Sequence, residues 1–259
     1  MRRAAAALLA LGWWACAAQL RPSLRSDLHA EVGSFIFEFG DADREAEQQL
    51  EAAVRHASPR LAVWGGLTEP VTVHVLSSHL ALEQAVDHPG YIWLKAWGRY
   101  DEVFVQSPRT WSLFGAEQSE VDELMLHELT HSVMYQQASD RTHWRRKGIP
   151  PWFREGMASF TAEQGSRWST PEDLARFYEQ NPAAPVGDPD ALTLSLAYGG
   201  AYHAFAFLVG RVGVEGVRSL LAAMKSGRSF DEAFEETVGV SQSAFLEGFR
   251  RAARSRKVG

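Results

Sequence analysis

The chain has 259 residues, of which 46% are hydrophobic, and its formal net charge is −6. This length fits one large domain or two small lobes, and the apolar content is sufficient for a buried core. Because the balance is acidic and basic residues form only short runs, nucleic-acid binding is excluded as the expected function. One such run, residues 145–147, is expected in a solvated loop, with a rim contact for an acidic substrate as the alternative.

The first 18 residues have the pattern of an export signal. Arg2 and Arg3 precede an apolar run at 4–14, and small residues follow at 15–18, as in a secretory signal peptide. Cys16, the only cysteine, stands where a bacterial lipoprotein signal places its lipidated cysteine, and ordinary cleavage one or two residues later is the alternative. We expect an exported protein of the periplasm, cell envelope or extracellular space, either soluble or attached to the membrane through Cys16.

Residues 33–108 predict a small α/β lobe. Alternation of apolar and polar residues predicts a strand at Val71–Leu76. The other expected strands are at 35–39, 91–97 and 102–106, the last two paired and antiparallel, and the expected helices are at 41–57 and 79–86. His74 and His79 are interpreted as ordinary polar positions.

An apolar helix is predicted at 119–135, beginning at Ser119, and it contains the sequence H-E-L-T-H. His127 and His131 are four residues apart, so they lie on one face of the helix, separated by roughly 6 Å along its axis. The two imidazoles can therefore converge on one cation, with Glu128 beside a water bound to that cation. This is the arrangement of a zinc peptidase. The alternative is a chance match on a charged surface helix.

Glu155 is the expected third metal ligand. It follows the two prolines of P-P-W-F-R-E-G-M-A, which suit the first turn of a second helix. A catalytic zinc needs three protein ligands and one open position. We therefore predict one Zn²⁺ per chain, held by His127, His131 and Glu155. The alternative is a solvated glutamate near a helix start.

The remainder of the chain predicts a helical lobe closing one side of a cleft. Helices are expected at 170–180, 196–212, 214–226, 230–238 and 241–255, and glycines separate most of them.

H-E-L-T-H followed by P-W-F-R-E-G-M-A resembles the gluzincin metallopeptidases, the thermolysin-like clan, and in particular their bacterial peptidase-MA-like group. The resemblance covers roughly residues 100–250. It implies a zincin-like α+β fold: a small N-terminal α/β lobe with an antiparallel edge strand and the active-site helix (33–138), then a helical C-terminal lobe (139–259). Together these form a single domain from residue 19, after the signal at 1–18. In such folds the edge strand can hold a peptide by strand addition, and Val103–Val105 is the expected edge. Ser159 departs from the family, which often has an acid at that position to orient a histidine ligand.

The resemblance also implies a hydrogen-bond donor for the negative charge that develops on the substrate oxygen. Tyr198, Tyr202 and His203 are the candidates, from the sequence A-Y-G-G-A-Y-H. Tyr198 is the expected catalytic donor because it stands near the helix start beside two glycines, whereas Tyr202 is expected to pack in the core.

Two hypotheses for function follow. The first is an exported zinc metallopeptidase acting on peptide or protein substrates, with Glu128 as the general base. The second is a non-catalytic envelope protein that keeps the fold for binding or assembly. The presence of Glu128 favours the first.

Overall fold

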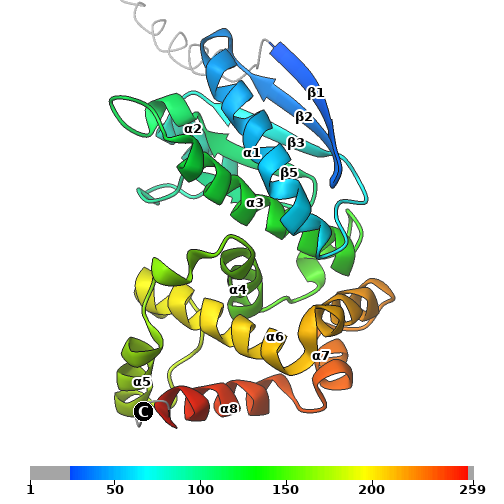
Figure 1. The fold of residues 1–259 in the computed structure, drawn as a ribbon, viewed down its shortest axis with the longest axis vertical. Helices are drawn as coiled ribbons and strands as arrows, with labels where there is room; N and C mark the ends of the chain where they lie inside the picture. Colours follow the sequence, from blue (N-terminus) through cyan, green and yellow to red (C-terminus); the bar gives the residue numbers. More distant parts are fainter. Residues whose placement is uncertain (1–23, 256–259) are drawn as a thin grey trace, which may run out of the picture.

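The computed structural model describes residues 24–255 and consists of an α/β half followed by a helical half (Figure 1). The expected export signal and Cys16 lie outside the described residues. Within residues 24–255, no helix is both long and apolar enough to cross a membrane.

The α/β half is built on one five-stranded sheet with the strand order β1-β2-β3-β5-β4. The three central strands are parallel, and both edge strands are antiparallel to their neighbours. The strands are β1 (Leu24–Ala30), β2 (Gly33–Phe39), β3 (Val71–Leu76), β4 (Ala96–Gly98) and β5 (Glu102–Gln106). The expected antiparallel edge strand is therefore confirmed, and so is the strand at Val71–Leu76.

The prediction of which strand forms that edge was wrong. Val103–Val105 belongs to β5, which pairs with β3 on one side and with β4 on the other. The edge is β4, and it has only three residues instead of the expected seven. Residues 91–94 form a turn closed by a hydrogen bond from the Leu94 amide to the Tyr91 carbonyl, so they cannot continue the strand. β1 was not expected, because its residues are largely polar.

Helices cover the two faces of the sheet unequally. α1 (Arg44–Ala62) and α3 (Gln118–Ala138) lie on one face, and α2 (His79–Val86) lies on the other (Figure 1). Val103 and Val105 point into the main core, which includes residues of α1 and α3, whereas Phe104 packs with the separate apolar cluster around α2. This alternation follows from the two-residue period of a strand.

α3 is the buried helix predicted from the sequence, but it begins earlier than expected. Glu117 precedes the helix and accepts from the Glu120 amide, while the Glu120 side chain accepts from the Glu117 amide. This reciprocal cap, and not Ser119, begins the helix, because it satisfies two amides that have no partner within the first turn.

The helical half packs beneath α3 (Figure 1). Its helices are α4 (Pro151–Thr161), α5 (Pro171–Gln180), α6 (Leu194–Lys225), α7 (Phe230–Val238) and α8 (Gln242–Ser255). α6 contains a break at Gly213, whose φ of 70° is non-helical, so the two shorter helices expected on either side of residue 213 are confirmed. The overall α+β arrangement agrees with the prediction.

Candidate active site

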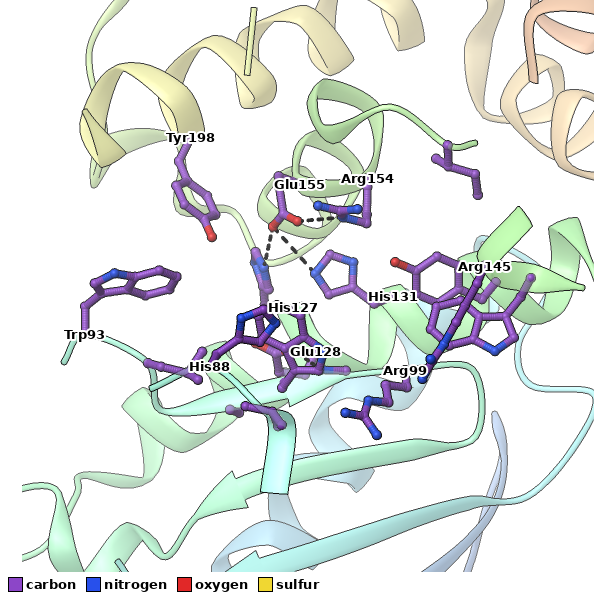
Figure 2. Close-up of a pocket in the computed structure, with 18 of the residues that line it drawn as sticks. His88, Trp93, Arg99, His127, Glu128, His131, Arg145, Arg154, Glu155 and Tyr198 are labelled. Atoms are coloured by element: carbon purple, nitrogen blue, oxygen red, sulfur yellow. Dashed lines mark hydrogen bonds and ion pairs between the residues drawn. The ribbon is translucent and has the colours of Figure 1, made fainter. Parts of the chain in front are cut away.

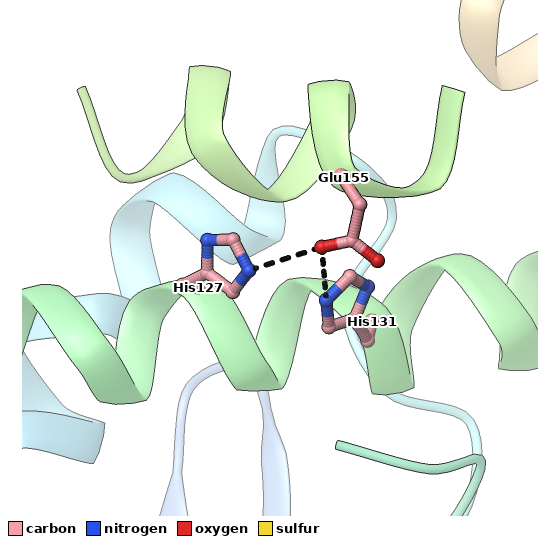
Figure 3. Close-up of side chains that lie close together, drawn as sticks. All are labelled: His127, His131 and Glu155. Carbon is pink, nitrogen blue, oxygen red and sulfur yellow. Dashed lines mark ion pairs between the residues drawn. The ribbon is translucent and has the colours of Figure 1, made fainter. Parts of the chain in front are cut away.

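Two helices bring the three predicted metal ligands together. His127 and His131 project from α3, and Glu155 projects from α4 towards them (Figure 3). The Nε2 atoms of both histidines lie 3.6 Å from the same oxygen, Oε2 of Glu155. All three ligand atoms lie within 4.8 Å of one another.

This cluster fits a zinc ion. Ligands of a tetrahedral zinc, each about 2.0–2.2 Å from the metal, lie roughly 3.4 Å from one another, and the two 3.6 Å separations match that value closely. Two imidazole nitrogens and one carboxylate are the donor types that a catalytic zinc accepts while keeping a position open. The three side chains are also nearly buried, and burying them without a cation would be costly.

Arg154 holds the other oxygen of the Glu155 carboxylate. Its Nε lies 2.9 Å from Oε1 of Glu155, which leaves Oε2 to face the histidines. Burial alone would raise the pKa of Glu155, but the nearby His131, His127 and Arg154 outweigh it and hold that pKa below its usual range. Glu155 is therefore ionised, as a metal ligand must be.

The two histidines differ in their electrostatic surroundings. Burial lowers the pKa of His131 to about 3, against the attraction of Glu155. Burial also acts to lower the pKa of His127, but Glu155 and Glu128 outweigh it and raise that pKa. His131 is therefore neutral at physiological pH. His127 binds a proton more readily, and a bound metal cation would displace that proton.

Glu128 lies next to the cluster without belonging to it. Its Oε2 accepts a hydrogen bond of 2.6 Å from the backbone N–H of Gly98, at the end of β4. Burial raises the pKa of Glu128 to about 7, although His127 acts in the opposite direction. A carboxyl group with a pKa near neutrality can both accept and release a proton, as a general base requires.

Gly98 is needed for this approach of β4 to α3. A Cβ atom at residue 98 would lie only 2.5 Å from the backbone oxygen of Glu128. Trp97 pairs with Phe104 of β5. On either side of it, the Lys95 carbonyl accepts from the Gln106 amide, and the Arg99 amide donates to the Glu102 carbonyl. The N–H and C=O groups of Ala96 and Gly98 therefore point away from β5, and the Gly98 N–H meets Glu128 there.

A cleft of about 430 Å³ runs past the cluster (Figure 2). Both β4 and the helical half contribute to its walls. The lining includes Trp93, Ala96, Trp97, Gly98, Arg99, His127, Glu128, His131, Tyr135, Trp144, Arg145, Arg154, Glu155 and Tyr198. Arg145, which was expected in a solvated loop, therefore faces the cleft, and its guanidinium lies over the Trp144 ring.

Of the three candidates for the oxyanion donor, only Tyr198 lines this cleft. Its hydroxyl points towards Glu155 and His127 (Figure 2), and its ring stacks on Trp168. Burial raises the pKa of Tyr198 well above its usual value, and the charge of Glu155 adds to this effect, so the phenol keeps its proton and can donate it in a hydrogen bond.

The two other candidates lie elsewhere. Tyr202 packs against Phe160 and against Gly165, where a Cβ would meet its ring at 2.5 Å. His203 lines a separate apolar groove beside α5 and α8. The catalytic role of Tyr198 stays a prediction.

The structure also places residues that sequence reasoning treated as polar or did not single out. His74 stacks on Phe104 and pairs with Glu38 on the outer face of the sheet, away from the cluster. Ser159 is buried, and within residues 24–255 its hydroxyl has no hydrogen-bond partner. Gln164 lies beside His127 instead, with its Oε1 3.0 Å from Nδ1 of that ring. It is 37 residues from His127, so no local pattern could have identified it.

The chain matches no protein-family profile, and no curated protein matches its sequence. Its fold, however, is similar to that of Legionella pneumophila aminopeptidase A, solved in complex with aspartic acid. The TM-score is 0.55 at 16% identity, over 87% of this chain and 28% of the Legionella chain. A mutant of a two-domain M1 zinc metallopeptidase bound to L-arginine gives a TM-score of 0.44 at 13% identity, over 89% of this chain and 51% of that one.

The chain has a zincin-like fold. It also carries the His-His-Glu cluster of the gluzincin type, with two ligands in the H-E-x-x-H sequence on α3 and the glutamate on α4. The fold expected from the sequence is confirmed. The chain spans little more than a quarter of the length of the Legionella protein.

Proposed function

We propose that this protein is a zinc-dependent peptidase that hydrolyses peptide bonds. The observation that carries the proposal is the position of Glu128, which lies beside the three ligands, in the same cleft, and is held by the Gly98 amide. A helix that only bound a metal would not need a carboxylate of raised pKa next to the ligands. The name of the structurally similar Legionella protein, an aminopeptidase, supports peptides as the substrate class.

The residues of the cleft suit the steps of hydrolysis. Zinc held by His127, His131 and Glu155 would polarise the scissile carbonyl and make water more acidic. Glu128 accepts the proton of the attacking water and passes it to the departing amine. Tyr198 donates a hydrogen bond to the oxygen on which negative charge develops.

The edge of the sheet aligns the substrate. The outward N–H and C=O groups of Ala96 and the C=O of Gly98 can pair with an extended peptide, which would add to the sheet next to β4. The Gly98 N–H is already bonded to Glu128, so a peptide bound next to β4 lies beside the base. The proposal of strand addition thus moves from Val103–Val105 to β4.

The discriminating experiment compares wild type, Glu128→Gln and His131→Ala for zinc content and for digestion of an unbiased peptide library. We expect about one zinc per chain in the wild type and in Glu128→Gln, with loss of zinc in His131→Ala. Hydrolysis should fall by orders of magnitude in Glu128→Gln, because glutamine keeps the shape but accepts no proton. Equal hydrolysis by Glu128→Gln and wild type would refute the peptidase mechanism. Zinc without any hydrolysis in the wild type would favour the non-catalytic envelope protein.

Export is a second part of the proposal, and it rests on the N-terminal sequence. Mass spectrometry of the mature N-terminus from cells decides the form. A lipidated Cys16 indicates a membrane-anchored protein, and a start at residue 18 or 19 indicates a soluble product. An N-terminus that still carries Met1 contradicts export.

A further inference from the structure

His127 is held at the nitrogen that faces away from the metal position. Its Nδ1 lies 3.0 Å from Oε1 of Gln164, and Gln164 is itself buried. Gln164 begins a short 3-10 helix just after α4. The chain reaches it through Glu163, whose φ of 55° is a left-handed conformation that is uncommon for a residue other than glycine. This turn brings Gln164 back against α3.

The orientation of the Gln164 amide follows from its second partner. Its Nε2 lies 2.8 Å from Oε1 of Glu123, which is one helical turn before His127 on α3. Glu123 is also paired with Arg167. An ionised carboxylate only accepts hydrogen bonds, so the NH₂ group of Gln164 must face Glu123 and its oxygen must face His127.

This orientation determines the tautomer of His127. Because the oxygen of Gln164 can only accept, Nδ1 of His127 must carry the hydrogen. In the neutral ring, the lone pair is then on Nε2, the atom that lies 3.6 Å from Oε2 of Glu155. A metal ligand needs its lone pair at that position.

We propose that Gln164 is a positioning residue for the metal site, and that Glu123 and Arg167 hold its amide so that Nε2 of His127 always presents its lone pair to the cation. This inference rests on the proposed zinc site, and it adds residues that the ligand motif does not contain. The polar chain from Arg167 to His127 fixes one ligand before the metal arrives.

The second histidine has no comparable support. Within residues 24–255, the outer nitrogen of His131 has no hydrogen-bond partner, and neither has the hydroxyl of Ser159. The two histidines are therefore held unequally. Loss of Gln164 should remove most of the orienting contacts that the described side chains supply to the ligand rings.

The test measures zinc affinity of the metal-free protein by competition with a chromogenic chelator. Gln164→Leu keeps the size of the side chain but makes no hydrogen bond, and we expect zinc to bind about tenfold to a hundredfold more weakly. Gln118→Leu is the matched control. Gln118 lies on α3 and, like Gln164, donates to a carboxylate, that of Asp122. It does not contact the cluster, so its loss should leave the affinity unchanged.

A charge-conserving exchange tests the orientation itself. Glu123→Gln alone allows the Gln164 amide to turn either way, and should weaken zinc binding. In the double variant Glu123→Gln/Gln164→Glu, the new carboxylate at position 164 accepts from Nδ1 of His127, and the new amide at position 123 donates to that carboxylate. This variant should therefore recover much of the lost zinc affinity. A merely structural role for Gln164 predicts no such recovery.

Nitrogen NMR of the histidine rings gives a readout that does not require zinc. In metal-free wild type at about pH 9, where the imidazole is neutral, His127 should show a protonated Nδ1, and Gln164→Leu should show a mixture of tautomers. A protonated Nε2 in the wild type, or equal zinc affinity in Gln164→Leu and wild type, would overturn the inference. If the NMR result holds but the wild type binds no zinc, the proposed function fails and the assignment of the tautomer stands.

Discussion

Gly156 offers a sharp test of how the two halves of the cleft are held together. It follows Glu155 on α4, where α4 packs against α6 (Figure 1). A Cβ at residue 156 would lie 2.5 Å from the backbone oxygen of Ala201 and 2.8 Å from Cβ of Phe205. Ordinary contact begins at 3.4 Å, so Gly156→Ala must push α4 and α6 apart by about 1 Å.

This displacement should lower both the free energy of unfolding and the catalytic rate, and each effect can be measured on its own. Overpacking of this kind costs about 1–3 kcal/mol, which urea unfolding measures as a lower midpoint with an unchanged slope. Tyr198 lies one turn before Ala201 on α6, so it moves relative to the cluster, and a shift near 1 Å can lower the rate by about a hundredfold. Zinc content should stay near one per chain, because the three ligands lie on α3 and α4 and none lies on α6.

Gly210 supplies the matched control. It also lies in α6, but no atom lies within 4 Å of the Cβ that alanine would add. Gly210→Ala should therefore be neutral or stabilise the protein by up to about 1 kcal/mol, because alanine favours the helix. The reasoning is refuted if Gly156→Ala unfolds at the wild-type urea concentration and retains the wild-type kcat.

Three further predictions concern the site. Burial raises the pKa of Glu128 from 4.5 to about 7 in the metal-free fold. Between these two pH values the folded state still binds a proton that the unfolded state has lost, so the free energy of unfolding falls as the pH rises from 4.5 to about 7. Glu128→Gln removes the cost of burying the ionised carboxylate. It should stabilise the metal-free protein by about 1–3 kcal/mol at about pH 8, and little near pH 4. Urea unfolding of both proteins across pH checks this, and the same pH dependence of stability in both would contradict it. Tyr198→Phe should lower kcat by about a hundredfold or more, with KM and zinc content little changed. If Tyr198→Phe keeps the wild-type kcat and Tyr202→Phe loses it, the assignment of the donor to Tyr198 is wrong. Gly98→Ala should lower both the thermal midpoint and kcat, since its Cβ would displace the backbone of Glu128, and retention of both values would argue against the close approach of β4.

Much of the secondary structure was predictable because its signals are local. Alternation in Val71–Leu76 matched β3 at both ends, and Thr170 with Asp173 forms the cap that begins α5. Gly213 was recognised as a break because glycine readily takes a positive φ. Such features depend on neighbours within a few residues, and the sequence contains those neighbours explicitly.

The errors concern contacts between distant segments. Strand order was misjudged because Val103 and Val105 have the same alternation whether their strand is central or at the edge. The edge position of β4 depends on the turn at 91–94 and on the close approach of Gly98 to α3. Ser159 was noted as a departure from the acid that the family often has at that position, but no residue was predicted in its place, and the structure puts Gln164 beside His127.

By itself, the sequence determined the metal-binding half of the site. The i,i+4 spacing of His127 and His131 places both rings on one helix face, and the proline-led segment before Glu155 predicts the helix that carries the third ligand. Only the tertiary structure decided which tyrosine enters the cleft, which strand edge faces it, and which side chain holds His127. Those answers require the packing of α4 against α6 and of β4 against α3. The periodicity of one helix repeats every few residues and can be read along the chain, whereas the partner of a buried side chain depends on how whole elements meet in space.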